Sequence, residues 1–239
     1  AEEVNYSKVD LNRVAMIAEH TTDFGLNIRN QTVYADYQKR YQNTFPDQGL
    51  GVVTTQFNPD ATGATLLGLA RLDGYVSSTP RRNVFNQTDF TYKWQMSPEI
   101  HHTILFGAEV GNQKTTDNRD LSCFVLSLPH VCANRRVSAP FFWPTVYVPV
   151  VFGNPNRRRN TDLDLAAGYV QDQIAITKYI DVLAGVRFDH FNLRFTGVDA
   201  TTYVPFALNR VDEKWSPRVG LVLKPTEQIS VYGSYSRSF

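Results

Sequence analysis

Long apolar runs are absent from this chain. No stretch of 18 or more apolar residues occurs, although hydrophobic residues make up 42% of its 239 positions. A transmembrane helix needs about 20 such residues, so the sequence excludes one. If the chain crosses a membrane, it must do so as a β-barrel, because only helices and closed barrels satisfy every backbone polar group in hydrocarbon. The start, Ala1–Val4, lacks the features of a signal peptide and indicates a mature, processed or excised chain.

An excess of charge of one sign is also lacking. The 24 Lys and Arg residues nearly balance the 23 Asp and Glu residues, which leaves a net charge of +1. This balance gives no indication of nucleic-acid binding. Cysteine is scarce, and its two copies, Cys123 and Cys132, fall in one irregular segment. A disulfide between them fits an oxidising compartment; two free thiols are the alternative, and no spaced ligands support zinc.

Aromatic residues, by contrast, are plentiful. They make up 13% of the chain, with 12 Tyr and 15 Phe. Such a surplus suits a protein that meets the boundary between membrane and water, where amphipathic rings settle. An aromatic-rich β-sandwich is the alternative that composition leaves open.

Side chains alternate between apolar and polar along several segments, as in a strand with one apolar face. Within 89–96, for example, Phe90, Tyr92 and Trp94 alternate with Asp89 and Lys93. We expect about eight strands, paired as hairpins. The clear cases are 89–96, 103–110, 182–189 and 215–224, and the weaker ones are roughly 7–18, 26–41, 163–177 and 228–239.

The connections between these strands alternate in length. The short turns are expected near 19–25, 97–101, 178–180 and 225–227, and the long connections over roughly 42–83, 112–161 and 197–212. Compact soluble domains rarely contain connections of forty or more residues. Outer-membrane barrels do, with short periplasmic turns and long extracellular loops. The pattern therefore favours an outer-membrane barrel over a soluble sheet.

An unbroken polar row indicates which face would be the lumen. Gln87, Asp89, Thr91, Lys93 and Gln95 share one face of their strand. In the apolar interior of a small barrel each unpaired polar group would cost about 1–3 kcal/mol. A wide, wet or plugged lumen removes that cost, and the opposite apolar row then faces lipid. A solvated face of a soluble sandwich is the alternative.

Several segments resemble the barrel of TonB-dependent siderophore receptors, in the order in which that family has them. They are Asn86–Asp89, His102–Glu109, Tyr169–Gln173, Gly185–Asp189, Trp215–Gly220 and Val231–Phe239. The resemblance implies an all-β, transmembrane antiparallel barrel in the bacterial outer membrane, with no cofactor. It also implies a receptor that takes up ferric siderophores and is energised through TonB.

The resemblance also indicates what the chain lacks. Family members have an N-terminal plug domain and a segment that contacts TonB, and neither is present in 1–239. Their barrels have 22 strands. We therefore expect 1–239 to be one partial barrel domain, about eight strands of a larger wall. Contact with the TonB complex would depend on the missing N-terminal region.

Two sets of residues are candidates for function. The first would bind an anionic iron chelate, because the longest predicted loop carries basic and aromatic side chains. It comprises Phe142, Trp143, Tyr147, Arg157, Arg158 and Arg159, with Tyr203 in the next loop. Surface arginines also meet phosphates of lipopolysaccharide, which we expect as a partner along with outer-membrane lipid. The second set is a lumen network of Asp172, Arg187, Asp189 and Arg218.

Other classes of protein are weaker alternatives. The chain could be a complete eight-stranded outer-membrane barrel with a structural or adhesion role. We expect no enzyme, because no catalytic set of residues is recognisable. We also expect no metal site, since the adjacent His101 and His102 would point to opposite faces of a strand.

Overall fold

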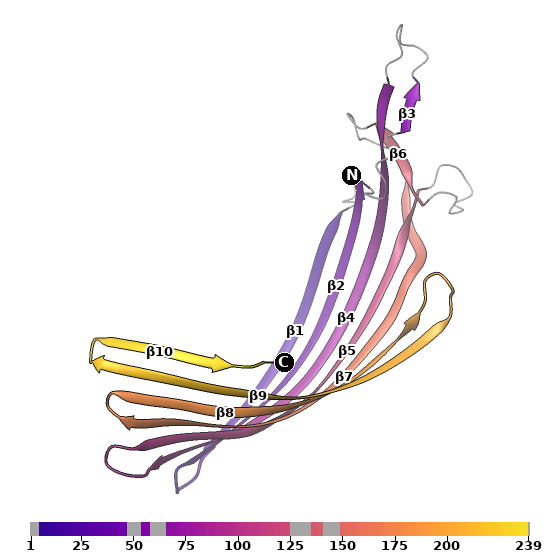
Figure 1. Ribbon diagram of the computed structural model, residues 1–239. Helices are drawn as coiled ribbons and strands as arrows, with labels where there is room; N and C mark the ends of the chain where they lie inside the picture. The colour runs from indigo at the N-terminus through magenta and orange to yellow at the C-terminus, as the bar shows by residue number, and fades with distance from the viewer. Residues whose placement is uncertain (1–4, 47–53, 58–65, 125–134, 141–148, 239) are drawn as a thin grey trace.

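The computed structural model describes residues 5–46, 54–57, 66–124, 135–140 and 149–238, which form one curved antiparallel sheet (Figure 1). Its eight long strands are β1 (Tyr6–Thr21), β2 (Leu26–Pro46), β4 (Leu66–Gln95), β5 (His101–Phe124), β7 (Val150–Thr177), β8 (Ile180–Val198), β9 (Pro205–Thr226) and β10 (Ile229–Ser236). Two short strands, β3 (Thr54–Phe57) and β6 (Val137–Pro140), pair with β4. No helix in the described part of the chain could cross a membrane.

The long strands lie side by side in the order β1-β2-β4-β5-β7-β8-β9-β10, so each pairs with its neighbours along the chain. This confirms the predicted all-β, antiparallel arrangement of about eight strands. The sheet is not closed, because β1 and β10 form its two edges in the described structure (Figure 1). A complete eight-stranded barrel therefore does not describe this chain.

The four predicted short turns are confirmed, and they lie at one end of the sheet, which we call the short-turn end. They join β1 to β2, β4 to β5, β7 to β8 and β9 to β10. In the first, the backbone nitrogen of Gly25 donates to the carbonyl oxygen of Thr22 at 2.9 Å. Gly25 has a φ of 88°, a left-handed conformation that glycine adopts without steric cost.

The predicted long connections are wrong over most of their length, because they are largely strand. β2 continues to Pro46, β5 to Phe124, and β7 begins at Val150, while β8 and β9 are joined by only 199–204. β7 alone has 28 residues, whereas about 9–11 suffice to span a bilayer. Beyond that span the strands mix polar and apolar residues without a regular pattern. The backbone ladder continues there, but the sequence no longer alternates.

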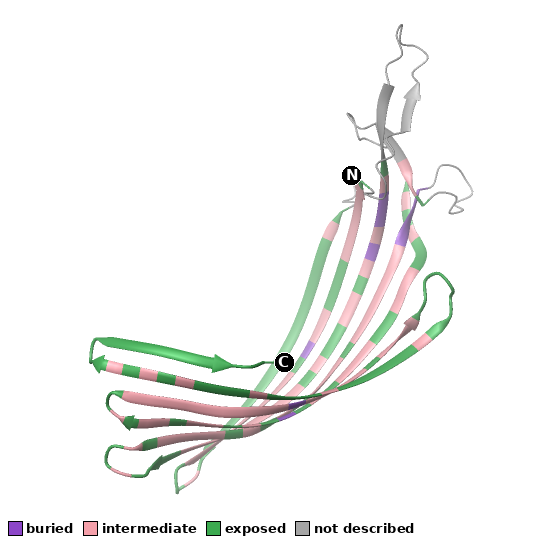
Figure 2. Ribbon diagram, in the orientation of Figure 1, coloured by how far each residue is buried: buried purple, intermediate pink, exposed green. Residues whose placement is uncertain are grey.

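The register divides the side chains between two faces. The inner face carries Asp89, Tyr169 and Arg187, and the outer face carries Phe90, Phe106 and Trp215. The buried residues Ala35, Ala167 and Asp189 point inward, whereas outward apolar side chains are more exposed, with Trp94 at 45% and Val219 at 53%. Figure 2 shows how buried, intermediate and exposed residues are distributed along the strands. A curved sheet crowds the side chains of its concave face, so the inner face is the concave one.

Three glycines on the inner face are each covered by an aromatic ring of the residue paired with them. Tyr169 covers Gly107, Phe85 covers Gly111 and Phe206 covers Gly197. A Cβ atom at Gly111 would lie 2.1 Å from the Phe85 ring. An aromatic ring folded over a facing glycine stabilises a strand pair at a point where the sheet bends. The three pairs span β4 to β9 and fit the curvature of the sheet.

Candidate functional site

Basic and aromatic side chains gather on the inner face toward the end opposite the short turns. They line a hollow of about 570 Å³ that crosses β2, β4, β5 and β7. We call this set the basic–aromatic cluster. It consists of Lys39, Tyr41, Tyr75, Arg81, Asp117, Arg119 and Arg157. Four of its members are cations and only Asp117 is a carboxylate, so the hollow has an excess of positive charge.

The aromatic part of the cluster is already arranged around one guanidinium. The Arg119 guanidinium lies 4.9 Å from the centre of the Tyr75 ring. Tyr41 and Phe45 contact the same ring, with centroids at 5.7 and 5.9 Å. Arg119 Nε donates to Asn156 Oδ1 at 3.0 Å. Because this guanidinium both packs on the Tyr75 ring and donates to Asn156, its position is fixed without a ligand.

The basic part of the cluster is only partly neutralised. Arg157 pairs with Asp117 at 3.0 Å, and Arg81 Nε donates to the neutral Thr115 hydroxyl at 3.1 Å. Arg119 lies near the end of β5 opposite the short turns, well beyond the band of outward apolar side chains that would face lipid (the apolar band). Burial lowers the pKa of Arg119, and the neighbouring Arg157 guanidinium lowers it further. Crowded cations of this kind attract an anion from solution.

The structure changes the predicted ligand set. Arg157, Arg158 and Arg159 belong to β7 and not to a loop, so their side chains alternate between faces. Arg157 and Arg159 point inward, and Arg159 lies 5.9 Å from the Phe195 ring. Arg158 points outward and pairs with Asp120. Its grouping with the other two was wrong, because adjacent strand residues face opposite sides.

The remaining members of that predicted set lie elsewhere. Phe142, Trp143 and Tyr147 fall outside the described residues. Tyr203 is 69% exposed, with a φ of 59°, in the turn between β8 and β9. Backbone nitrogens of that turn donate to the Asp199 carboxylate, which lowers its pKa. Tyr203 is therefore placed on an ordered turn and not in the basic–aromatic cluster.

Sequence reasoning missed the half of the cluster that β2 and β4 supply. Lys39 was assigned to a strand with weak alternation, and Tyr75 and Arg81 to a long connection. Their common face is visible only through pairing, which places Lys39 opposite Thr79 and Tyr41 opposite Ser77. The sequence carried one signal of this shared face. All these residues have odd numbers, and alternate residues of a strand lie on the same face.

A second polar cluster crosses the inner face nearer the short-turn end. Arg187 donates to Asp189 at 2.7 Å and to Glu109 at 2.8 Å, and its guanidinium lies 5.5 Å from the Tyr169 ring. The Tyr169 hydroxyl bonds Asp89. These contacts join β4, β5, β7 and β8 into one network, which we call the lumen network. Arg187 and Arg218 line a second hollow on the inner face, and Arg218 makes no ion pair among the described residues.

Asp172 was wrongly placed in this network, because the register puts it on the outer face. It accepts a hydrogen bond from His102 Nδ1 at 2.7 Å, and the His102 ring lies 5.1 Å from that of Trp94. Arg187 instead is paired with Tyr169, an odd-numbered residue of β7. Across the described ranges, no group of three or more His, Cys, Asp or Glu could hold a metal ion.

Cys123 is buried, with 1% exposure, at the end of β5. It is disulfide-bonded. Its predicted partner, Cys132, lies outside the described residues.

We expect Arg187→Met to destabilise the protein by about 3 kcal/mol. The substitution would leave Glu109 and the nearly buried Asp189, whose side chain is 8% exposed, without their shared cation. The free energy of unfolding in urea, measured on detergent-solubilised protein by tryptophan fluorescence, tests this. The control is Arg210→Met, which removes an arginine that is 71% exposed and pairs with Asp212. Equal losses for the two variants would contradict the role of the lumen network.

Comparison with known proteins places the fold. The family model described as TonB dependent receptor-like, beta-barrel matches residues 2–239. The structure is similar to the siderophore receptor PiuA from Acinetobacter baumannii, with a TM-score of 0.71 and 21% identity over 97% of this chain and 32% of that one. It is also similar to the closed form of the ferric-catecholate import receptor Fiu from E. coli, with a TM-score of 0.74 and 15% identity over 98% and 33%.

The chain spans about a third of the length of these solved structures. No curated protein matches its sequence. The family consists of receptors and transporters, and the match covers nearly every residue of the chain. The chain therefore belongs to the TonB-dependent receptor-like β-barrel family of the outer membrane of Gram-negative bacteria.

Proposed function

We propose that this chain is part of the barrel wall of a receptor that takes up ferric siderophores, energised through TonB. The basic–aromatic cluster is the observation that carries the proposal, because its charge and rings suit an anionic chelate. Solved structures with the same fold are named as siderophore and ferric-catecholate receptors, which supports the same substrate class. Outer-membrane lipid and lipopolysaccharide would surround the barrel, and coupling to TonB would require a plug domain.

The chemistry of the cluster favours a ferric catecholate or another planar, anionic chelate. Catechol rings can lie against Tyr41 and Tyr75, while the guanidinium groups of Arg119 and Arg157 meet the negative charge of the iron complex. The single carboxylate, Asp117, is already paired with Arg157, so it offers little repulsion to an anion. The hollow of about 570 Å³ is open to the inner face and can accept part of such a ligand.

The test is binding of an iron(III) tris-catecholate to the full-length receptor in detergent, followed by intrinsic fluorescence. We expect Arg119→Gln combined with Arg157→Gln to weaken binding about 100-fold, at about tenfold per charge-assisted contact. The loss should shrink as salt is raised, since added ions screen the same attraction.

Arg158→Gln is the matched control, because Arg158 lies on the same strand and points to the opposite face. It should leave chelate affinity unchanged. If the double variant and the control bind the chelate equally well at every salt concentration, the cluster is not the binding site.

A further inference from the structure

The tripeptide Asn-Gln-Thr occurs twice, on two strands that pair with each other. It forms Asn30–Thr32 on β2 and Asn86–Thr88 on β4, and the antiparallel register sets each asparagine opposite the threonine of the other tripeptide. The asparagines and threonines have even numbers, so they lie on the outer face with Phe90, whereas the two glutamines lie on the inner face. We call the four outward residues the amide–hydroxyl patch.

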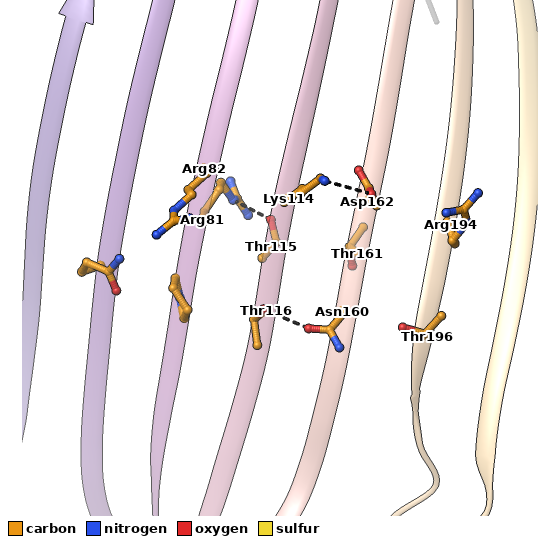
Figure 3. A pocket seen from close by; sticks show the side chains of 12 residues that line it. Arg81, Arg82, Lys114, Thr115, Thr116, Asn160, Thr161, Asp162, Arg194 and Thr196 are labelled. Carbon is orange, nitrogen blue, oxygen red and sulfur yellow. Dashed lines mark hydrogen bonds and ion pairs between the residues drawn. The ribbon is translucent and has the colours of Figure 1, made fainter.

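This patch lies inside the apolar band. On β4 the outward residues of the band run from Trp94 to Val84, a length that matches the span of about 9–11 residues needed to cross a bilayer. Asn86 and Thr88 fall within this length. The next outward residue is Arg82, one of the charged side chains that Figure 3 shows beyond the band. The patch is therefore at the depth of the hydrocarbon, where no water hydrates amides or hydroxyls.

The two amides of the patch use all their hydrogens within it. Asn30 Nδ2 donates to Asn86 Oδ1 at 3.1 Å and to the Thr88 hydroxyl at 2.8 Å. Asn86 Nδ2 donates to Asn30 Oδ1 at 3.1 Å and to the Thr32 hydroxyl at 2.7 Å. The hydroxyl hydrogens of Thr32 and Thr88 have no acceptor among the described residues. Each asparagine oxygen keeps a second lone pair that accepts no hydrogen bond there.

Lipid cannot supply the missing partners. Acyl chains contain no acceptor, so a hydroxyl hydrogen that faces them stays without a hydrogen bond, at a cost in free energy. A protein surface with polar groups at the same depth would satisfy it. The amide–hydroxyl patch therefore favours a protein over lipid as its neighbour.

The residues beside the patch allow such a surface to come close. Ala18 on β1 and Ala108 on β5 are the outward neighbours of Asn30 and Thr88, and Gly168 on β7 lies next to Ala108. Ala18, Ala108 and Gly168 are all exposed. Small residues at an interface inside a membrane let two backbones approach each other. No large side chain separates the patch from a facing wall along this row.

We propose that the amide–hydroxyl patch is the centre of an interface between two copies of this protein in the outer membrane. An interface with two-fold symmetry is made by the same surface of both copies, so that surface must be complementary to itself. The patch meets this requirement, because it has two unused hydroxyl donors and two amide oxygens that can each accept one more hydrogen bond. The proposal rests on the register and the outer-membrane location, and it does not depend on siderophore uptake.

Sedimentation equilibrium of the full-length protein, in a neutral detergent that matches the density of the solvent, tests the proposal. We expect a dimer. Thr32→Val combined with Thr88→Val keeps the side-chain shape and removes four hydroxyl donors from each dimer. It should raise the dissociation constant about 60-fold, at about 2.8-fold for each hydrogen bond in a membrane. The matched control is Thr116→Val combined with Thr196→Val, because these threonines share the outer face but lie beyond the apolar band (Figure 3).

A second variant tests the close approach without touching a hydrogen bond. Ala108→Phe places a large apolar side chain beside the patch, and we expect it to raise the dissociation constant at least tenfold. Val219→Phe is its control, since Val219 is 53% exposed on the outer face of β9, away from the patch. Both substitutions put an apolar side chain into lipid, so each monomer should fold, which a compact unheated band on gel electrophoresis verifies.

Two results would overturn the proposal. If the wild-type protein is a monomer at every concentration, the patch faces a different membrane protein or lipid. If it is a dimer that both patch variants leave unchanged, the copies meet through another surface. Ferric catecholate binding is measured on the same samples and should be unaffected, because the basic–aromatic cluster lies on the inner face. A dimer that binds no ferric catecholate would refute the proposed function alone.

Discussion

Replacing Gly107 with valine should prevent most of the receptor from assembling into a heat-resistant barrel. A Cβ atom at this position would lie 2.5 Å from the backbone carbonyl oxygen of Thr88 and 2.6 Å from the Tyr169 hydroxyl. Thr88 is paired within β4 and β5, so its carbonyl cannot move away without breaking the backbone ladder. Overpacking of this kind costs about 1–3 kcal/mol, and a branched side chain lies at the upper end.

The measurement is the fraction of receptor that migrates as a compact, unheated band on gel electrophoresis. Gly168→Val provides the control, because Gly168 is on the adjacent strand and faces outward. The nearest atom to a Cβ there is the Gly107 carbonyl oxygen at 4.0 Å. If Gly107→Val and Gly168→Val assemble to the same extent, the close approach of Tyr169 and Thr88 does not make glycine necessary at position 107.

Replacing Asp73 with alanine should release the segment that contains β6 from the end of β4. Asp73 is 4% exposed and accepts hydrogen bonds from Arg135 and Arg136 at 3.0 Å each. The buried Ser122 hydroxyl and the Gly74 backbone nitrogen donate to the same carboxylate, at 3.3 and 2.7 Å. Removing one partner of a buried ion pair costs about 3–5 kcal/mol, because the remaining charges stay desolvated.

The expected result is a local opening and not global unfolding, since the rest of the β-ladder is unaffected. Trypsin cleaves after arginine, so cleavage at Arg135 and Arg136 should become at least tenfold faster. Asp10→Asn is the control, because Asp10 is 55% exposed in its pair with Lys8. Cleavage at the wild-type rate in the Asp73 variant would show that β6 is held by backbone pairing alone.

The two arginines bound by Asp73 also show how a composition-based interpretation of a site can go wrong. Arg135 and Arg136 are as basic as Arg157, yet both pair with the buried carboxylate of Asp73. The four cations of the basic–aromatic cluster, in contrast, have only the carboxylate of Asp117 among them. Counting basic residues in a segment does not reveal how many charges remain available. Only the contacts separate an anion site from a structural ion pair.

The sequence by itself determined the all-β class, the short turns and the apolar face of the four clearly alternating segments. Alternation along 89–96 and the turn formers beside it are local features, set by the requirement that one face meets lipid. The family resemblance also depends on such local segments. These features can be predicted because each is determined within about ten residues of chain.

The tertiary structure alone decided how far the strands extend and which side chains meet. Beyond the apolar band no hydrophobic pattern marks a strand, so only backbone pairing shows that β7 begins at Val150. Register has the same long-range origin, because a slip of one residue moves every side chain to the other face. Strand pairing therefore places Asp172 on the outer face, away from the lumen network. It also brings Lys39 and Arg157, far apart in sequence, into one hollow.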